Sequence, residues 1–216
     1  MNGGLFDILG SEAPAWRRRM RRRRFGRDEV VFHEGEIGDT VHVIEKGRVL
    51  VEVSTARGDV AALSVRGPGD MIGELAIVGG GRRSARVTTL EPTETLSLTQ
   101  ATLDDLRKED PRVDRYLLEL LARKMQETTA QLVEVLFIGV EKRVLRVVDR
   151  LASAFDDGDG GPIVLRVRQE DIAAMAGTRR QTANRPLKAA EAAGAIALRR
   201  GRIEVIDRDA LASLAS

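Results

Sequence analysis

A glycine, a glutamate, an arginine and a serine fall close together in the first half of the chain and together suit a phosphate ester. They occur in two short segments, Gly73-Glu74-Leu75 and Arg83-Ser84-Ala85. A glycine lets backbone N–H groups approach an anion, and an arginine and a serine add a cation and a hydroxyl to the same oxygens. A carboxylate beside a phosphate is unfavourable unless the ligand also donates hydrogen bonds, as a sugar hydroxyl does. The pattern predicts a ribose phosphate site, with a structural ion-pair role for Arg83 as the alternative.

A second polar set lies near the C-terminus, at the expected start of a short helix. It occupies the segment Thr178-Arg179-Arg180-Gln181-Thr182-Ala183-Asn184-Arg185. Four of these residues are one, three or four positions apart and share a helical face: Arg180, Gln181, Asn184 and Arg185. Arginine suits O6 and N7 of guanine, and glutamine suits N6 and N7 of adenine, while Thr178 or Thr182 could bond a phosphate. The pattern favours reading of DNA bases, and the alternative is a solvated basic face.

The composition excludes several kinds of site. The 216 residues include no cysteine, which removes disulfides, thiolate zinc sites, iron–sulfur clusters and cysteine nucleophiles. Only His33 and His42 remain for metal or acid–base work, and we interpret both as ordinary solvated or satisfied residues at strand ends. No triad or pair of carboxylates has a convincing setting, so we expect neither an enzyme nor a metal site.

Hydropathy and charge indicate the compartment and the class of partner. No apolar run approaches the roughly 20 residues of a membrane span, and no secretory signal precedes the first strands. We therefore expect a cytoplasmic protein without a membrane partner. Residues 1–139 carry 21 Lys/Arg and 22 Asp/Glu, whereas residues 140–216 carry 14 and 11. A modestly basic C-terminal part is compatible with nucleic-acid binding.

Short strands must hold the first site. Between about Val30 and Thr99 apolar runs recur between glycine turns, and Val49, Val51 and Val53 show the alternation of a half-buried strand. Many short strands between turns favour a sandwich or a jelly-roll barrel. Before the barrel, seven of the eight positions from Arg17 to Arg24 are arginine, and we interpret this run as a solvated helix, with a contact to a phosphate or to a partner protein as the alternatives.

A long helix is expected from Pro111 to about Phe137, because no proline or glycine interrupts it. One narrow stripe along it carries Leu117, Leu121, Thr128, Leu132 and Val135. A stripe this narrow is typical of a two-helix seam and predicts a homodimer, with an ordinary amphipathic core helix as the alternative. Thr128 is a hydroxyl in an otherwise apolar seam, which a purine edge or its own helix carbonyl could satisfy.

The C-terminal part predicts a winged helix-turn-helix. A helix from Glu141 to Phe155 is followed by a turn-rich loop over residues 156–162, a strand at Ile163–Val167 and two short helices. A basic hairpin closes the pattern around Arg199-Arg200-Gly201-Arg202. The expected fold class is therefore α+β, with a β-jelly-roll domain at residues 1–110, a long dimerisation helix at 111–138 and a winged helix-turn-helix at 139–216.

The segment Gly73-Glu74-Leu75 with Arg83-Ser84-Ala85 resembles the phosphate-binding cassette of cyclic-nucleotide-binding domains. From about Val30 to Asp207 the chain resembles bacterial transcription regulators of the cyclic AMP receptor protein (CRP/FNR) family. The resemblance implies that Glu74 takes the ribose 2′-hydroxyl and that Arg83 and Ser84 take the cyclic phosphate. It also implies cyclic AMP as effector, double-stranded DNA with a two-fold operator as partner, a homodimer, and a contact with RNA polymerase.

The same resemblance assigns roles to residues outside the cassette. Thr128 and Thr129 match the pair that contacts adenine from both subunits. Base-reading positions would be held by Arg180, Gln181 and Arg185, and phosphate positions in the wing by Arg199, Arg200 and Arg202. The alternatives are a regulator that is independent of any ligand, a regulator that responds to cyclic GMP or another effector, and a cyclic-nucleotide-responsive module that binds another protein.

Three residues depart from the family pattern. Gln181 stands where the cyclic AMP receptor protein has glutamate, so the base preferred at that position is in doubt. Pro186 falls inside the recognition helix and removes one backbone donor, which we interpret as a bend. Arg168 occupies the usual place of a serine or threonine helix cap.

Overall fold

The computed structural model describes residues 4–55, 58–156, 158 and 161–216. The chain divides into two units. The first comprises Met1–Ser54 and Val65–Glu127, and the second comprises Thr55–Ser64 and Thr128–Ser216. Among the described residues no helix is long and apolar enough to cross a membrane.

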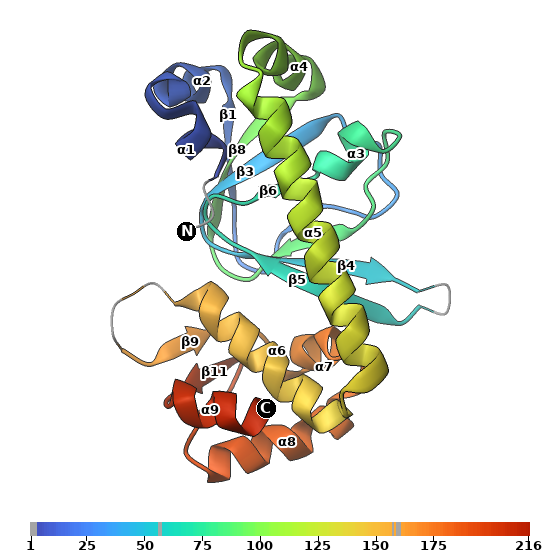
Figure 1. Cartoon of the computed structure of the whole chain (residues 1–216), viewed down its shortest axis with the longest axis vertical. Helices are drawn as coiled ribbons and strands as arrows, with labels where there is room; N and C mark the ends of the chain where they lie inside the picture. Colours follow the sequence, from blue (N-terminus) through green and yellow to red (C-terminus); the bar gives the residue numbers. More distant parts are fainter. Residues whose placement is uncertain (1–3, 56–57, 157, 159–160) are drawn as a thin grey trace. The chain divides into compact units, whose positions relative to one another are not determined.

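The N-terminal half of the chain forms two four-stranded sheets, with strand orders β1-β8-β3-β6 and β2-β7-β4-β5. All of their strands lie in the first unit except β5, most of which falls in the segment Thr55–Ser64 of the second unit. The pairings of β8 with β1 and β3, of β3 with β6, and of β7 with β2 and β4 are all antiparallel. The strands are Arg21–Phe25 (β1), Val30–Phe32 (β2), Thr40–Lys46 (β3), Val49–Ser54 (β4), Val60–Arg66 (β5), Met71–Ile72 (β6), Arg86–Thr89 (β7) and Thr93–Thr99 (β8). The expected β-rich domain, long helix and helix-turn-helix are confirmed (Figure 1).

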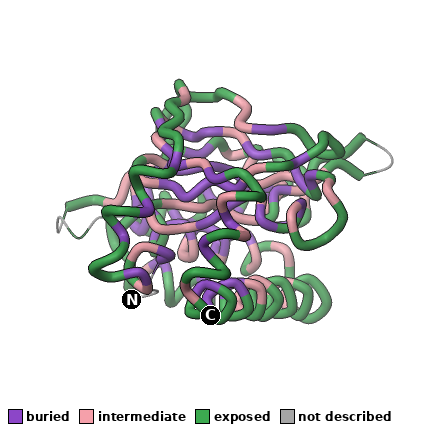
Figure 2. Tube along the Cα trace, turned by 90° about the horizontal axis from the view of Figure 1, so that it is seen from above, coloured by how far each residue is buried: buried purple, intermediate pink, exposed green. Residues whose placement is uncertain are grey.

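The two faces of the β1-β8-β3-β6 sheet pack into different clusters. One face, with Val41, Val43, Leu96 and Leu98, packs against helices that flank the barrel. The other cluster joins residues of both sheets: Phe32, Ile44, Val49, Ile72 and Val87. Figure 2 shows buried segments of the trace alternating with intermediate and exposed ones.

The arginine run forms two different elements. Short helices at Leu5–Leu9 (α1) and Ala13–Arg19 (α2), separated by a 3₁₀ turn at Gly10–Glu12, contribute Leu5, Leu9 and Trp16 to the first cluster. The run ends α2 and then continues as strand β1, so the expectation of one solvated helix was wrong. The second half of the run pairs antiparallel with β8, and Arg22 also forms ion pairs with Glu45 at 2.9 Å and Glu94 at 2.8 Å, on β3 and β8.

Two helices follow the barrel, Gln100–Glu109 (α4) and Arg112–Phe137 (α5). Thr99 caps α4 by accepting a hydrogen bond from the backbone N–H of Thr102. The carboxylate of Asp110 accepts one from the backbone N–H of Arg112, at the start of α5. α5 is 26 residues long, which corresponds to about 39 Å.

The second unit contains the helix-turn-helix. Its helices are Val140–Phe155 (α6), Gln169–Met175 (α7), Arg180–Ala192 (α8) and Arg208–Ala215 (α9). Its strands are Ile163–Leu165 (β9), Ile196–Arg199 (β10) and Arg202–Val205 (β11), and they form a three-stranded sheet with the order β10-β11-β9. The sequence analysis did not foresee α9, although Asp207 caps it by accepting from the Ala210 backbone N–H. Within the expected loop at 156–162, Asp157, Asp159 and Gly160 lie outside the described residues.

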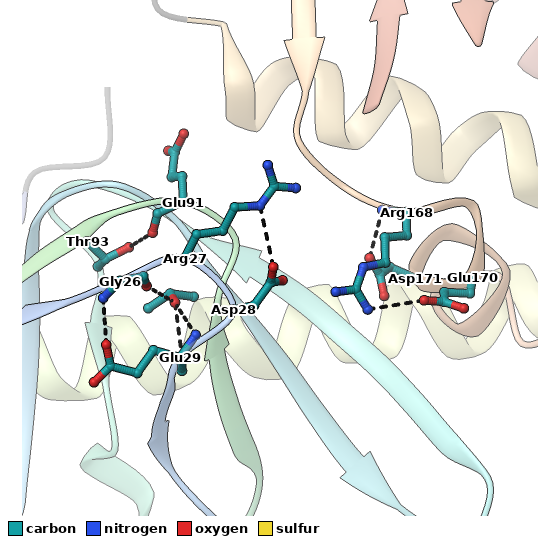
Figure 3. A network of polar contacts seen from close by, with 10 residues as sticks. Gly26, Arg27, Asp28, Glu29, Glu91, Thr93, Arg168, Glu170 and Asp171 are labelled. Atoms are coloured by element: carbon teal, nitrogen blue, oxygen red, sulfur yellow. Dashed lines mark hydrogen bonds and ion pairs between the residues drawn. The ribbon is translucent and has the colours of Figure 1, made fainter. Parts of the chain in front are cut away.

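Side chains shape two of the connections drawn in Figure 3. Between β1 and β2 the backbone N–H of Gly26 donates to a Glu29 carboxylate oxygen at 2.6 Å, which closes the turn. At the start of α7, where Arg168 replaces the usual cap, Asp171 accepts from the Arg168 backbone N–H at 2.8 Å. This is the bond that the third helical residue makes in a capping box: it satisfies the backbone N–H of Arg168, whose own side chain forms no cap hydrogen bond.

Candidate functional site

The cassette forms where β6 gives way to a short helix. Gly73 has a φ of +82°, and the helix Glu74–Val78 (α3) follows it directly. A Cβ at position 73 would overlap Nη1 of Arg83, so glycine is required by both conformation and space. A cavity of about 50 Å³ is lined by all six residues of the two cassette segments: Gly73, Glu74, Leu75, Arg83, Ser84 and Ala85. Because small-molecule sites usually have ≈ 300–1,000 Å³, a nucleotide enters only if lining side chains move outward.

Arg83 is held at the base of this cavity by neutral oxygens. Its side chain is buried, with the residue 6% exposed. Nη1 donates to the backbone oxygens of Thr40 at 2.7 Å and Gly73 at 3.0 Å, and Nη2 donates to the Thr40 hydroxyl at 3.0 Å. The guanidinium also lies over the Phe32 ring, 4.1 Å from its centroid.

No carboxylate of the described residues forms an ion pair with Arg83. Burial therefore lowers the pKa of Arg83, and the more distant charges of Asp39, Glu36 and Glu74 oppose that shift. Arginine nevertheless stays protonated in proteins. A buried cation whose hydrogen-bond partners are all neutral favours the binding of an anion. The alternative of a structural ion-pair role for Arg83 has no support in this arrangement.

Gly38 is a site residue that the sequence analysis missed. A Cβ there would lie 2.7 Å from Nε of Arg83 and 2.7 Å from Cβ of Ala76, far closer than real contacts allow. The loop before β3 therefore needs a glycine so that the arginine can occupy its place. Thr40 and Phe32 were missed as well, because each lies on a strand distant in sequence from the cassette.

Glu74 does not stand alone beside the anion site. It is 2% exposed, and one of its carboxylate oxygens accepts from Nζ of Lys124 at 2.6 Å. Lys124 also donates to the backbone oxygen of Met71 at 3.3 Å. The lysine, on α5, was not predicted, and no periodic signal distinguishes it from a solvated residue. Its charge offsets the carboxylate, so the cassette as a whole keeps a cationic character.

A buried histidine lies behind the cassette. His42 is 7% exposed in the middle of β3, so the expectation of a strand-end position was wrong. Its Nδ1 lies 3.1 Å from the Thr95 hydroxyl, and its ring lies 6.2 Å from that of Phe32. Burial, followed by the charges of Arg83 and Arg23, lowers the pKa of His42 to about 4. Among the described residues no group of three or more His, Asp or Glu is placed to hold a metal ion.

The predicted seam residues lie differently along α5. Leu117 is 7% exposed and packs in the core of its own chain, so its assignment to a dimer interface was wrong. The exposed apolar residues repeat every seven positions instead: Leu118 at 69%, Met125 at 73% and Leu132 at 57%. Val135, at 51%, continues the stripe together with half-buried Leu121 and exposed Thr128.

Thr128 and Thr129 belong to the second unit and are exposed. Thr128 follows Lys124 by one helical turn, so the two residues share a face of α5. Neither threonine lines the cassette cavity. Their predicted contact with a ligand therefore stays a prediction.

The basic residues of the second unit gather at the start of α8. Its buried face consists of Ala183, Pro186, Leu187 and Ala190. The residues left exposed are Arg179, Arg180, Gln181, Thr182 and Arg185, with Thr178 and Asn184 half-buried at the margin. Lys188, also exposed, lies seven positions after Gln181 on the same face and was missed although its spacing could have revealed it.

A groove of about 390 Å³ separates the start of α8 from the hairpin of β10 and β11. Five arginines line it: Arg168, Arg180, Arg199, Arg200 and Arg202. Arg199 and Arg202 each form an ion pair with Glu204, at 3.4 and 2.9 Å. Glu170 also lines the groove and pairs with Arg168 at 3.2 Å, whereas Arg180 and Arg200 form no ion pair in the described part of the chain. Arg168 and Gln169 were not among the predicted DNA contacts.

Pro186 lies within α8, which runs without interruption from Arg180 to Ala192. Proline has no N–H, so the carbonyl of Thr182 lacks its usual helical donor. Thr182 is exposed, which leaves that carbonyl close to solvent. The helix accommodates the proline by burying its ring.

Comparisons with known proteins match both units. A family model described as the cyclic nucleotide-binding domain matches residues 22–110, and one described as the Crp-like helix-turn-helix domain matches residues 142–214. The CRP-like cAMP-activated global transcriptional regulator of Mycobacterium tuberculosis is 32% identical over 190 residues, which are 87% of this chain and 85% of that protein. The cyclic AMP receptor protein of Thermus thermophilus is 29% identical over 90% of this chain and 88% of that protein.

Solved structures show the same fold. The catabolite activator protein of Thermus thermophilus superposes with a TM-score of 0.54 at 27% identity, over 96% of this chain and 97% of that one. The c-di-GMP responsive global regulator CLP of Xanthomonas campestris superposes with a TM-score of 0.78 at 21% identity, over 91% of this chain and 98% of that one.

Proposed function

Since this chain belongs to the cyclic AMP receptor protein (CRP/FNR) family of transcription regulators, we propose that it is a homodimer whose binding to a two-fold DNA operator is modulated by cyclic AMP. As a member of this family, the chain contains a cyclic nucleotide-binding domain and a DNA-binding helix-turn-helix. The effector, the dimer, the residue roles and a contact with RNA polymerase are the proposed part.

The observation that carries the effector proposal is the buried guanidinium of Arg83. Its hydrogen bonds go to Thr40 and Gly73, and no carboxylate neutralises it among the described residues. A cyclic phosphate supplies the missing negative charge, with the Ser84 hydroxyl as a further donor. Glu74 then accepts the ribose 2′-hydroxyl, and the close backbone approach at Gly73 completes the phosphate contacts. Leu75 and Ala85 line the apolar part of the site.

Cyclic AMP is proposed over cyclic GMP because of Thr128 and Thr129. Both hydroxyls lie on the exposed part of α5, next to the apolar stripe that would meet a second copy. The resemblance to the family assigns both hydroxyls to contacts with adenine from the two subunits of a dimer. Two close relatives in sequence are named for cyclic AMP, which supports the same choice.

The DNA proposal rests on the exposed start of α8. Arg180, Gln181 and Arg185 read base edges, while Arg200 and Arg202 contact phosphates from the wing. A two-fold dimer places two such helices in successive major grooves. Half-sites are then expected about 10–10.5 base pairs apart, centre to centre.

A regulator of the same fold that answers to another effector is the second candidate. The ion pair of Lys124 with Glu74 and the cavity of about 50 Å³ favour it, because both oppose entry of a nucleotide. One solved structure with this fold is named as a c-di-GMP responsive regulator, but at 21% identity it supports only the fold. A third candidate is a module that binds another protein and not DNA. Binding to random duplex DNA with a steep salt dependence would exclude it.

Selection of duplexes from a randomised pool, with and without cyclic AMP, tests the proposal. The account expects a pseudo-palindromic site whose affinity rises about 5- to 150-fold with cyclic AMP, the usual range of allosteric coupling. Equal affinity with and without the nucleotide would contradict cyclic AMP as the effector but would not contradict DNA binding.

A further inference from the structure

We infer that Glu141 is a positioning residue for Arg185 and holds its guanidinium in the orientation that reads guanine. Glu141 lies in the first turn of α6, and Arg185 lies on the exposed face of α8. A Glu141 carboxylate oxygen lies 3.5 Å from Nε of Arg185. Both residues are in the second unit, and among the described residues the side chain of each forms no other hydrogen bond or ion pair.

The atom that is paired decides what the rest of the guanidinium can do. Arginine has five N–H donors: one on Nε and two on each terminal nitrogen. A guanine edge takes two parallel hydrogen bonds, at O6 and N7. Because Glu141 approaches from the Nε side, both terminal nitrogens stay available for that edge. The pair therefore serves DNA recognition and does not compete with it.

Arg185 needs such support because its own surroundings supply none. Its side chain is 85% exposed, and its neighbour Pro186 points into the core. A free arginine side chain has many rotamers, and binding must select one of them at a cost in entropy. α6 is fixed by a continuous buried face that includes Val144, Leu145 and Val148. A carboxylate on this rigid helix limits the rotamers of Arg185 before DNA arrives.

The contrast with Arg180 makes the inference specific. Arg180 starts α8 and has no ion pair in the described part of the chain, so no carboxylate limits its rotamers before DNA arrives. Glu141 also places a negative charge close to the reading face of α8, which opposes attraction to the phosphate backbone of any sequence. The two effects together favour sequence reading at the position that Arg185 contacts.

The inference rests on the proposed base-reading role of Arg185, and the experiment separates the two. The probes are the duplex selected from a randomised pool by the wild-type protein and a scrambled duplex of the same composition. Affinities are measured by fluorescence anisotropy for Glu141→Gln, Arg185→Ala and the double variant. Glu119→Gln is the matched control, because it removes a carboxylate from an exposed ion pair with Arg115 on α5.

Glu141→Gln is expected to weaken binding to the selected duplex about 2- to 5-fold, the range of an exposed ion pair, and to leave the scrambled duplex equal or tighter. Base preference should relax at a single guanine, and the effect should vanish in the Arg185→Ala background. Equal tightening of both duplexes, or an unchanged effect without Arg185, would overturn the inference. If Arg185→Ala itself leaves base preference unchanged, the base-reading proposal for Arg185 falls with it. All variants should unfold at the wild-type temperature, since both side chains are exposed.

Discussion

Thr40 and Arg83 are joined by two hydrogen bonds although 43 residues separate them in the chain. The backbone oxygen and the hydroxyl of Thr40 each accept from a different terminal nitrogen of the guanidinium. The start of β3 therefore fixes both the position and the plane of the arginine before any ligand arrives. A preorganised cation of this kind loses little conformational entropy on binding an anion.

Gly38→Ala is expected to weaken cyclic AMP binding by about tenfold or more, or about 1.4 kcal/mol. The added Cβ would lie 2.7 Å from Nε of Arg83, and the arginine cannot retreat without breaking its bonds to Thr40. Isothermal titration calorimetry measures the change. Gly161→Ala is the control, because a Cβ there meets nothing within 4 Å. Unchanged affinity for Gly38→Ala would show that the observed position of Arg83 is not the binding one.

The free energy of unfolding should depend on pH through His42. Its pKa is lowered from 6.5 to about 4 in the folded protein, so below pH 6.5 the unfolded chain binds the proton more readily. Stability is complete above pH 6.5 and falls as the pH drops toward 4. The loss amounts to about 3 kcal/mol at 1.36 kcal/mol per pKa unit.

Urea unfolding of the wild type and of His42→Gln at pH 7 and pH 4 measures this loss. The wild type should lose about 3 kcal/mol more than the variant over that interval. Carboxylates elsewhere titrate equally in both proteins and cancel in the difference. Parallel losses in the two proteins would mean that His42 is protonated without cost in the fold.

The oligomeric state should depend on Leu118 and Met125. Both are exposed at a seven-residue spacing on α5, and a charge at either position would be buried in a helix seam. Leu118→Glu and Met125→Glu are expected to shift sedimentation toward the monomer. Gln126→Glu adds the same charge to an exposed position outside the stripe and should leave the dimer intact. A monomeric wild type, or dimers in all three variants, would contradict the seam.

Arg180 and Arg200 should differ in how their loss affects DNA binding. Arg180→Ala should cost about 1–3 kcal/mol and relax preference at one base, whereas Arg200→Ala should weaken all sequences alike and reduce the salt slope by about one. Anisotropy titrations over a salt series with selected and scrambled duplexes distinguish the two patterns. Arg208→Ala, which removes an arginine paired with Asp149 and Asp156, is the control. Identical behaviour of Arg180→Ala and Arg200→Ala would contradict base reading by Arg180.

Local patterns predicted the cassette segments and most elements, because glycine turns, strand alternation and helix caps act over a few residues. Side chains contributed by distant strands were not predictable: Gly38, Thr40 and Phe32 meet Arg83 only through the topology of the sheets. Lys124 looked like any solvated lysine until the fold brought it to Glu74.

Two errors have clear physical origins. Leu117 and Leu118 are adjacent leucines, and only the packing of α5 on its own barrel decides which one is exposed. The arginine run read as helix by charge alone, yet acidic partners on β3 and β8 stabilise its second half as a strand. The expected domain limits at residues 110 and 138 stay predictions.

Calorimetric titration of wild type and Arg83→Ala with cyclic AMP tests the central claim most directly. The account predicts a dissociation constant near or below the micromolar range, or about −8 kcal/mol, for the wild type, and no measurable binding for Arg83→Ala. Cyclic GMP in the same titration should bind more weakly. Absence of binding by either nucleotide at millimolar concentration, or equal binding by the two proteins, would contradict a cyclic-nucleotide site built on Arg83.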